Sequence, residues 1–127
     1  MVSFDSFVPS GGRPIYLQIL YFIKRGAAAG TIRDGDELPS RRVLSSLLGI
    51  NPNTVQKAFR MLEDEELISS HSGAKSFMTI DEEKLCQLRR ELLAEDIRGI
   101  VMSLKQTGVS RAEALELIKT YWEENEI

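Results

Sequence analysis

Four cationic side chains lie in a stretch of the chain that has no acidic residue. Residues 38–62 contain no Asp or Glu, although the chain as a whole has 19 acidic and 16 basic residues. The four cations are Arg41, Arg42, Lys57 and Arg60. Lys and Arg pair with the phosphates of nucleic acid and release its condensed counterions, whereas a carboxylate would repel them. The pattern therefore predicts a surface that contacts a phosphate backbone.

Amide and hydroxyl side chains in the same stretch are suited to reading bases. Asn53 and Gln56 have amides that pair bidentately with adenine in the major groove. Thr54 is better suited to a phosphate contact. Any one of these residues alone would more often belong to an ordinary solvated helical hairpin, so the prediction of DNA binding depends on their combination.

Two short helices are predicted to position these side chains. Ser40 is a preferred N-cap residue, so a first helix is expected to begin at Arg41. Gly49 can take the left-handed conformation that ends a helix, and Asn51 followed by Pro52 begins a second one. Two helices joined by a short turn form a helix-turn-helix, whose second helix enters the major groove.

Each predicted helix also has an apolar face at helical spacing. For the first helix, the face expected to be buried is Val43, Leu44, Leu47 and Leu48. For the second helix it is Val55, Ala58, Phe59 and Leu62. The acidic run 63–66 that follows is expected to face solvent, away from phosphate.

A β-hairpin is predicted directly after the second helix. Segments 67–70 and 76–80 have strand character, and Gly73 lies in the turn between them. A hairpin in this place is the wing of a winged helix, with His71, Gly73 and Lys75 at its tip. We expect the tip to contact phosphate or the minor groove, and a plain surface hairpin is the alternative.

The charge distribution divides the chain into two parts. Residues 1–80 have nine Lys and Arg against eight Asp and Glu, a net charge of +1, whereas residues 81–127 have seven against eleven, a net charge of −4. We expect a winged helix-turn-helix DNA-binding domain at 1–80, with a flexible lead at 1–12 that has apolar residues able to dock and a core helix that starts near Pro14. Residues 81–127 are expected to form a two-helix dimerisation region. The predicted fold class is α+β, mostly α.

Two amphipathic helices are predicted within 81–127, separated by Gly108. The two helices cannot cover both apolar stripes well by themselves, and a long exposed stripe usually marks a partner surface, here a second copy of the chain. The alternative is that the stripes pack back on the winged helix of the same chain. The predicted interface residues are Leu85, Leu88, Leu92, Ile97, Ile100, Val101, Leu104, Leu115, Ile118 and Trp122.

Other functional classes receive little support from the sequence. No run approaches eighteen apolar residues and the amino terminus has no secretory pattern, so we expect a soluble, cytoplasmic protein with no membrane partner. Cys86 and His71 are single residues of their kind without neighbours at metal-ligand or catalytic spacing, so no metal, cofactor or enzyme activity is expected. Tyr121 and Trp122 could line a pocket for a small-molecule effector, but residues at this spacing are more often core or interface, and no effector is identified.

A series of short motifs gives the chain a resemblance to a known family. The motifs are Pro14-Ile15-Tyr16, Gly35-Asp36-Glu37-Leu38-Pro39-Ser40-Arg41-Arg42, Leu48-Gly49-Ile50, Asn53-Thr54-Val55, Ala58-Phe59, Leu62-Glu63 and Gly73-Ala74-Lys75-Ser76-Phe77. Over residues 14–80 the chain resembles the amino-terminal domain of GntR-family bacterial transcription regulators. Less specifically, residues 81–127 resemble the short carboxyl-terminal region of the YtrA-type subfamily.

The resemblance implies a homodimer that binds a palindromic double-stranded DNA operator and regulates, usually represses, neighbouring genes, often genes for transporters. Arg42 matches the arginine of the family's Leu-Pro-Ser-x-Arg motif, which contacts DNA, and Gly73 matches the wing glycine. The residues at the start of the recognition helix, where relatives contact bases and phosphates, are Asn51, Asn53, Thr54 and Gln56. Two positions depart from the pattern: Pro52 stands where many relatives have arginine, and Lys75 where the wing often has a second glycine.

Three hypotheses for function follow. The first is a sequence-specific DNA-binding regulator whose predicted contact residues are Ser40, Arg41, Arg42, Asn51, Asn53, Thr54, Gln56, Lys57, Arg60, His71, Gly73 and Lys75. The second is a winged-helix adaptor that binds a protein partner and no DNA, and the third is a small-molecule sensor without an operator. Salt-dependent binding to heterologous DNA separates the first hypothesis from the second.

Overall fold

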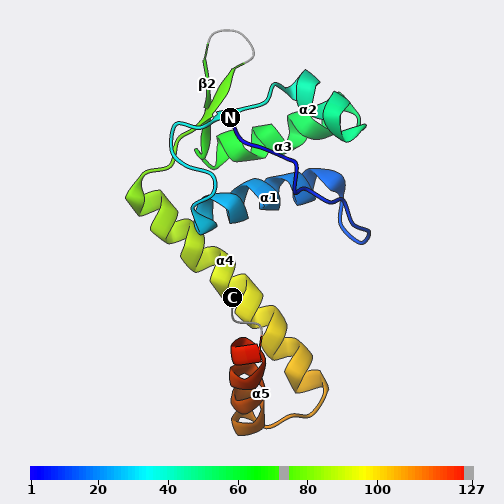
Figure 1. Cartoon of the computed structure of the whole chain (residues 1–127), viewed down its shortest axis with the longest axis vertical. Coiled ribbons are helices and arrows are strands. Elements are labelled where there is room, and N and C mark those ends of the chain that lie inside the picture. The colour runs from blue at the N-terminus through cyan, green and yellow to red at the C-terminus, as the bar shows by residue number, and fades with distance from the viewer. Residues whose placement is uncertain (72–74, 125–127) are drawn as a thin grey trace. The chain divides into compact units, whose positions relative to one another are not determined.

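The computed structural model describes residues 1–71 and 75–124 (Figure 1). The chain divides into two compact units, Met1–Arg89 and Arg90–Ile127, which are considered separately. No described helix is long and apolar enough to cross a membrane.

The first unit is a three-helix core with a small sheet. Its elements are α1 (Ile15–Ala29), β1 (Glu37–Leu38), α2 (Arg41–Leu48), α3 (Pro52–Asp64), β2 (Ile68–Ser70), β3 (Ser76–Met78) and the start of α4 (Glu82–Gln106). Helix α3 packs against both α1 and α2, and the antiparallel sheet has the strand order β1-β3-β2. This is the predicted mostly α winged helix-turn-helix fold.

Helix α2 begins and ends, and helix α3 begins, at the predicted capping residues. Ser40 Oγ accepts a hydrogen bond from the backbone N–H of Val43 at 3.1 Å, which caps α2. Gly49 ends α2 in the left-handed conformation, with φ 66°. Asn51 Oδ1 then accepts from the backbone N–H of Asn53 at 2.8 Å, and Pro52 is the first residue of α3. These caps fix the first turns of α2 and α3, and so they fix where the backbone places the polar residues of those turns, Arg41 and Arg42 in α2 and Asn53 and Thr54 in α3.

The prediction for the buried face of α2 was wrong at two positions. Leu44 is fully buried, but Val43 and Leu47 are 56% and 62% exposed. The face turned toward the protein is instead Arg41, Leu44, Ser45 and Leu48, which recur at helical spacing. Ser45 is tolerated inside because its hydroxyl donates to the carbonyl of Arg42 at 2.9 Å.

The amino-terminal segment and β1 add long-range contacts to the first unit. Val2 and Phe4 are buried, and the backbone N–H of Val2 donates to the carbonyl of Glu37 at 2.7 Å. Phe4 stacks on Phe22 of α1 with ring centroids 4.9 Å apart. Strand β1 is not among the predicted elements, and it pairs with β3 with Leu38 opposite Ser76.

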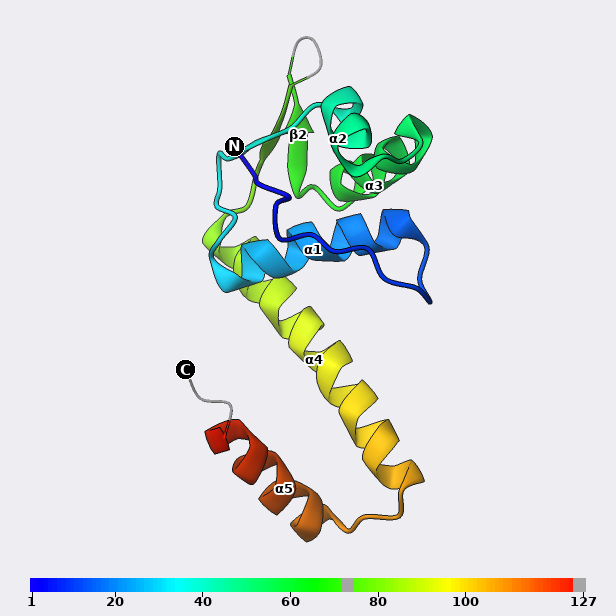
Figure 2. The same cartoon turned by 45° about the vertical axis from the view of Figure 1, so that its right-hand side comes forward.

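The second unit consists of the rest of α4 and of α5 (Arg111–Glu124). The chain reverses direction between them (Figure 2), where Gly108 has φ 79°. Ser110 Oγ accepts from the backbone N–H of Glu113 at 3.2 Å and caps α5, as predicted. Large apolar side chains remain exposed on both helices of this unit: Leu93, Ile97, Ile100, Val101 and Met102 on α4, and Leu115, Leu117, Ile118, Tyr121 and Trp122 on α5.

Candidate nucleic-acid interface

Helix α3 has an apolar face inside the protein and a polar face outside. Its buried residues are Val55, Ala58, Phe59 and Leu62, as the apolar periodicity predicts. On the other side of the helix, Asn53, Lys57 and Arg60 are exposed, whereas Thr54 and Gln56 are half-buried. The polar face therefore presents an amide and two cations to solvent, with a second amide at its edge.

Lys57 is held in place by an aromatic side chain of α1. Its Nζ lies 4.0 Å from the centroid of the Tyr16 ring, a geometry in which the ring face attracts the cation. Lys57 is exposed, so its ammonium can also bind an anion. This contact could not be predicted from the sequence, because it depends on how α1 packs against α3.

The side-chain oxygens of Ser40 and Asn51 cap α2 and α3, respectively. Each oxygen accepts a backbone N–H within its own helix start. Asn51 is exposed and Ser40 is half-buried. In the structure these two side chains therefore fix the first turns of α2 and α3.

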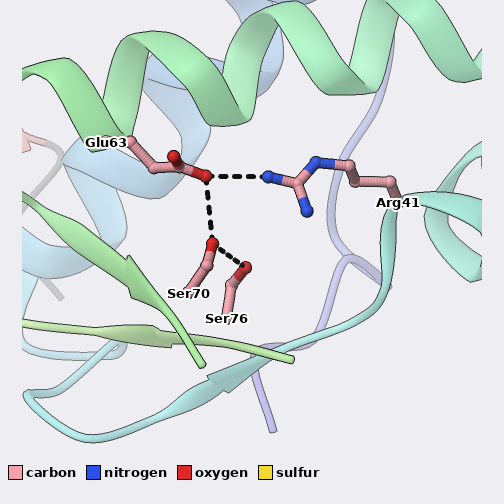
Figure 3. Close-up of polar contacts among 4 residues, drawn as sticks. All are labelled: Arg41, Glu63, Ser70 and Ser76. Carbon is pink, nitrogen blue, oxygen red and sulfur yellow. Dashed lines mark hydrogen bonds and ion pairs between the residues drawn. The ribbon is translucent and has the colours of Figure 1, made fainter. Parts of the chain in front are cut away.

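The neighbouring arginines Arg41 and Arg42 lie in different environments. Arg42 is exposed, as expected of a phosphate contact. The side chain of Arg41 is only 25% exposed, and its Nη2 donates to Glu63 Oε1 at 2.7 Å (Figure 3). The expectation that the acidic run 63–66 faces solvent was wrong for Glu63, which is half-buried because it pairs with Arg41.

The same glutamate connects α3 to the hairpin. Ser70 of β2 donates from Oγ to Glu63 Oε1 at 3.1 Å, and Ser70 Oγ lies 3.2 Å from Ser76 Oγ of β3 (Figure 3). A signal for Glu63 was present in the sequence, because it lies four residues after Phe59 and so at the edge of the buried face of α3. The pairing with Arg41, 22 residues earlier, had no such signal.

The predicted hairpin is confirmed as an antiparallel pair of β2 and β3. His71 and Lys75 are exposed at its far end, and the backbone N–H of His71 donates to the carbonyl of Lys75 at 2.9 Å. The His71 ring also lies edge-on to Phe77, with centroids 5.3 Å apart. Gly73, the third residue predicted at the tip, lies outside the described residues.

The residues predicted for a dimer interface divide into covered and exposed groups. Leu88 and Leu92 are buried within a single chain, and Leu85 and Leu104 are half-buried. The other six are exposed: Ile97, Ile100, Val101, Leu115, Ile118 and Trp122. Trp122 is the most open of these, at 73% exposure.

Helix-turn-helix proteins contact DNA through the second helix of the motif, and α3 occupies that position with its polar face uncovered. Together with the hairpin that follows it, this arrangement defines a winged helix domain of the DNA-binding class. The family model described as "Bacterial regulatory proteins, gntR family" matches residues 15–77. The chain belongs to this GntR family and, within it, to the YtrA-like subfamily.

Two relatives from Bacillus subtilis match most of the chain. An uncharacterised helix-turn-helix-type transcriptional regulator, YhcF, is 32% identical over 87% of this chain and 92% of its own length. The helix-turn-helix-type transcriptional repressor YtrA is 30% identical over 87% of this chain and 86% of its own length. A solved GntR-family regulator from Listeria monocytogenes superposes with a TM-score of 0.80 at 28% identity, over 88% of this chain and 98% of its own. The chain is therefore a DNA-binding transcription regulator and not an enzyme.

Proposed function

We propose that the chain is a sequence-specific repressor that binds a palindromic operator as a homodimer. Helix α3 of each copy would enter the major groove, and the hairpin would lie on the adjacent backbone or minor groove. The observation that carries this proposal is the outward face of α3, where Asn53, Lys57 and Arg60 are exposed and no carboxylate occurs from residue 38 to residue 62. A polyanion fits such a surface better than a protein partner of mixed charge.

The side chains of this surface would have different roles on DNA. Asn53 and Gln56 would contact base edges, because their amides can pair with adenine. Thr54 would bond a phosphate. The exposed cations would contact phosphate or guanine: Arg42, Lys57, Arg60 and Lys75. Ser40, Asn51, His71 and Gly73 complete the proposed contact region at the helix starts and at the hairpin.

Residues 81–127 would form the dimer interface, with residues 1–80 as the DNA-binding domain. The support is the group of exposed apolar side chains on α4 and α5, since monomeric proteins rarely leave a large contiguous apolar patch in water. An isologous dimer would cover the same patch on both copies. Two-fold symmetry would then place the two α3 helices about 34–36 Å apart, one turn of DNA. Repression is proposed because the Bacillus subtilis relative YtrA is named a repressor.

Footprinting on the DNA upstream of the chain's own operon, at stated salt concentrations, tests this function. We expect protection of an inverted repeat and an affinity that falls as salt rises. Arg42→Ala is expected to weaken binding to every sequence and to reduce the salt slope by about 0.9 per lost phosphate contact. Gln56→Ala is expected to cost about 1–3 kcal/mol at particular base pairs only.

The matched control is Arg90→Ala, which removes another exposed arginine, on α4, that is neither in the proposed DNA contact region nor among the apolar residues predicted for the dimer interface. It should leave operator affinity unchanged. A wild-type protein that protects no inverted repeat, or an Arg42→Ala variant that binds like Arg90→Ala, would contradict the proposed function.

A further inference from the structure

Arg41 and Arg42 are adjacent in the sequence but lie on different faces of α2. Arg41 is in line with Leu44, Ser45 and Leu48 at helical spacing, on the face that packs against the protein. Arg42 lies on the exposed side. The two arginines therefore cannot present their guanidinium groups to the same environment.

Three observations show that the guanidinium of Arg41 faces the protein. Its Nη2 donates to Glu63 Oε1 at 2.7 Å, a short, charge-assisted hydrogen bond. Its Cζ lies 5.2 Å from the centroid of the buried Phe59 ring. Its Nε is buried and has no hydrogen-bond partner among the described residues. Because Nε is buried and an Nη2 N–H is already bonded to Glu63, the side-on pair of donors formed by Nε and Nη2 is not available for a bidentate contact with phosphate.

Glu63 extends this contact from the two helices to the hairpin. Its Oε1 accepts from Arg41 of α2 and from Ser70 Oγ of β2. Ser70 is paired with Ser76 across the hairpin, both through the strand register and through their hydroxyls. This is the last paired position of the two strands before the tip. One carboxylate thus connects the start of α2, the end of α3 and the outer end of the hairpin (Figure 3).

We propose that Arg41 is a positioning residue that fixes the hairpin relative to the helix-turn-helix, and that it is not a phosphate contact. Through Glu63, it holds Ser70 and Ser76 at the angle from which the hairpin tip meets DNA. The contribution to DNA affinity rests on the proposed function, because the hairpin matters for affinity only if it touches DNA. The contacts that join Arg41 to the hairpin through Glu63 do not depend on that function.

Arg41→Met tests the link without DNA, because Met keeps the apolar stem over Phe59 and removes the charge. Arg42→Met is the matched control on the exposed side. Hydrogen–deuterium exchange by NMR is expected to be about tenfold faster for the amides of β2 and β3 in Arg41→Met and unchanged in Arg42→Met, since the lost bond is charge-assisted. Equal exchange in the two variants would overturn the proposal, whether or not the protein binds DNA.

The salt dependence of operator binding separates positioning from phosphate contact. Arg41→Met is expected to lower affinity with an unchanged slope of log K against log salt, whereas Arg42→Met should reduce the slope by about 0.9. A slope reduced equally by both variants would identify Arg41 as a phosphate contact and reject the proposal. Failure of the wild-type protein to bind any DNA would reject the proposed function instead, and the exchange measurement would still decide the role of Arg41.

Reversal of the ion pair provides a rescue test. Arg41→Glu alone places two carboxylates together and is expected to weaken operator binding at least tenfold. Combining it with Glu63→Arg restores opposite charges and should recover most of that loss. A double variant that binds no better than Arg41→Glu alone would contradict the positioning role, because a restored pair would then not restore the hairpin.

Discussion

Glu66 has a backbone conformation that ordinary residues avoid, and its replacement by glycine should stabilise the protein. Its φ is 60°, and it is the one non-glycine residue with a positive φ in the part of the chain that the structure describes. It follows the end of α3, where its N–H donates to the carbonyl of Glu63 and the N–H of Leu67 donates to the carbonyl of Leu62, both at 2.9 Å. This is the Schellman pattern, in which the left-handed position is usually glycine.

The expected gain follows from two opposing contributions. The left-handed conformation costs a residue with a Cβ about 1–2 kcal/mol, and glycine removes that cost. Glycine also loses more chain entropy on folding, about 0.5–1 kcal/mol. The Glu66 side chain is exposed, and its carbonyl keeps its bonds from Lys84 Nζ and Thr79 Oγ1. Glu66→Gly should therefore stabilise the fold by about 0.5–1 kcal/mol, or about 2–4 °C in Tm.

Glu66→Ala is the control, because it removes the same negative charge but keeps the Cβ. Relief of repulsion within the acidic run 63–66 would stabilise both variants equally, whereas relief of backbone strain would stabilise only the glycine variant. Urea unfolding at one fixed protein concentration measures both, since association would make stability depend on concentration. A glycine variant no more stable than the alanine variant would refute the strain argument.

The other predictions concern the caps, the core and the exposed apolar face. Asn51→Ala removes the bond to the backbone N–H of Asn53 and should cost about 1 kcal/mol in urea unfolding. Leu44→Ala should cost about 2–5 kcal/mol because Leu44 is fully buried, whereas Leu47→Ala, at an exposed site, should change stability by less than about 0.5 kcal/mol; equal costs would contradict the face assigned to α2. Trp122→Ser should weaken self-association in sedimentation experiments and leave the helicity of the chain unchanged, and an unchanged association constant would argue against α5 as the interface.

Local chemistry explains why the helix boundaries could be predicted. Ser40 and Asn51 accept N–H groups two or three residues away, so the signal and the structure lie in the same few residues. Gly49 likewise ends α2 through its own backbone conformation. The hairpin was predictable for a related reason, because its two strands are close in sequence and pair directly with each other.

The orientation of α2 could not be fixed by the same reasoning. Val43 and Leu47 are one turn apart, and so are Leu44 and Leu48, so periodicity supports a face that contains either pair. In the structure, the second pair packs toward α3. Arg41 and Ser45 lie on the same face of α2, so they are also turned toward the protein. Both polar residues find partners there, Glu63 for Arg41 and a backbone carbonyl for Ser45. A hydrophobic pattern alone contains no information about those partners.

Linear charge patterns and surface charge therefore differ in this domain. The absence of acids from residues 38–62 suggested that every cation in that stretch faces phosphate, yet the next residue, Glu63, is half-buried and forms an ion pair with Arg41. Of the five cations predicted to contact DNA, the ones with exposed side chains are Arg42, Lys57, Arg60 and Lys75. If each of these four cations met one phosphate in both copies of a dimer, the slope of log K against log salt would have a magnitude of at most about 7. With Arg41 included as a fifth contact, the limit would be about 9. The structure thus assigns Arg41 to the architecture of the domain and leaves the electrostatic attraction to its exposed neighbours.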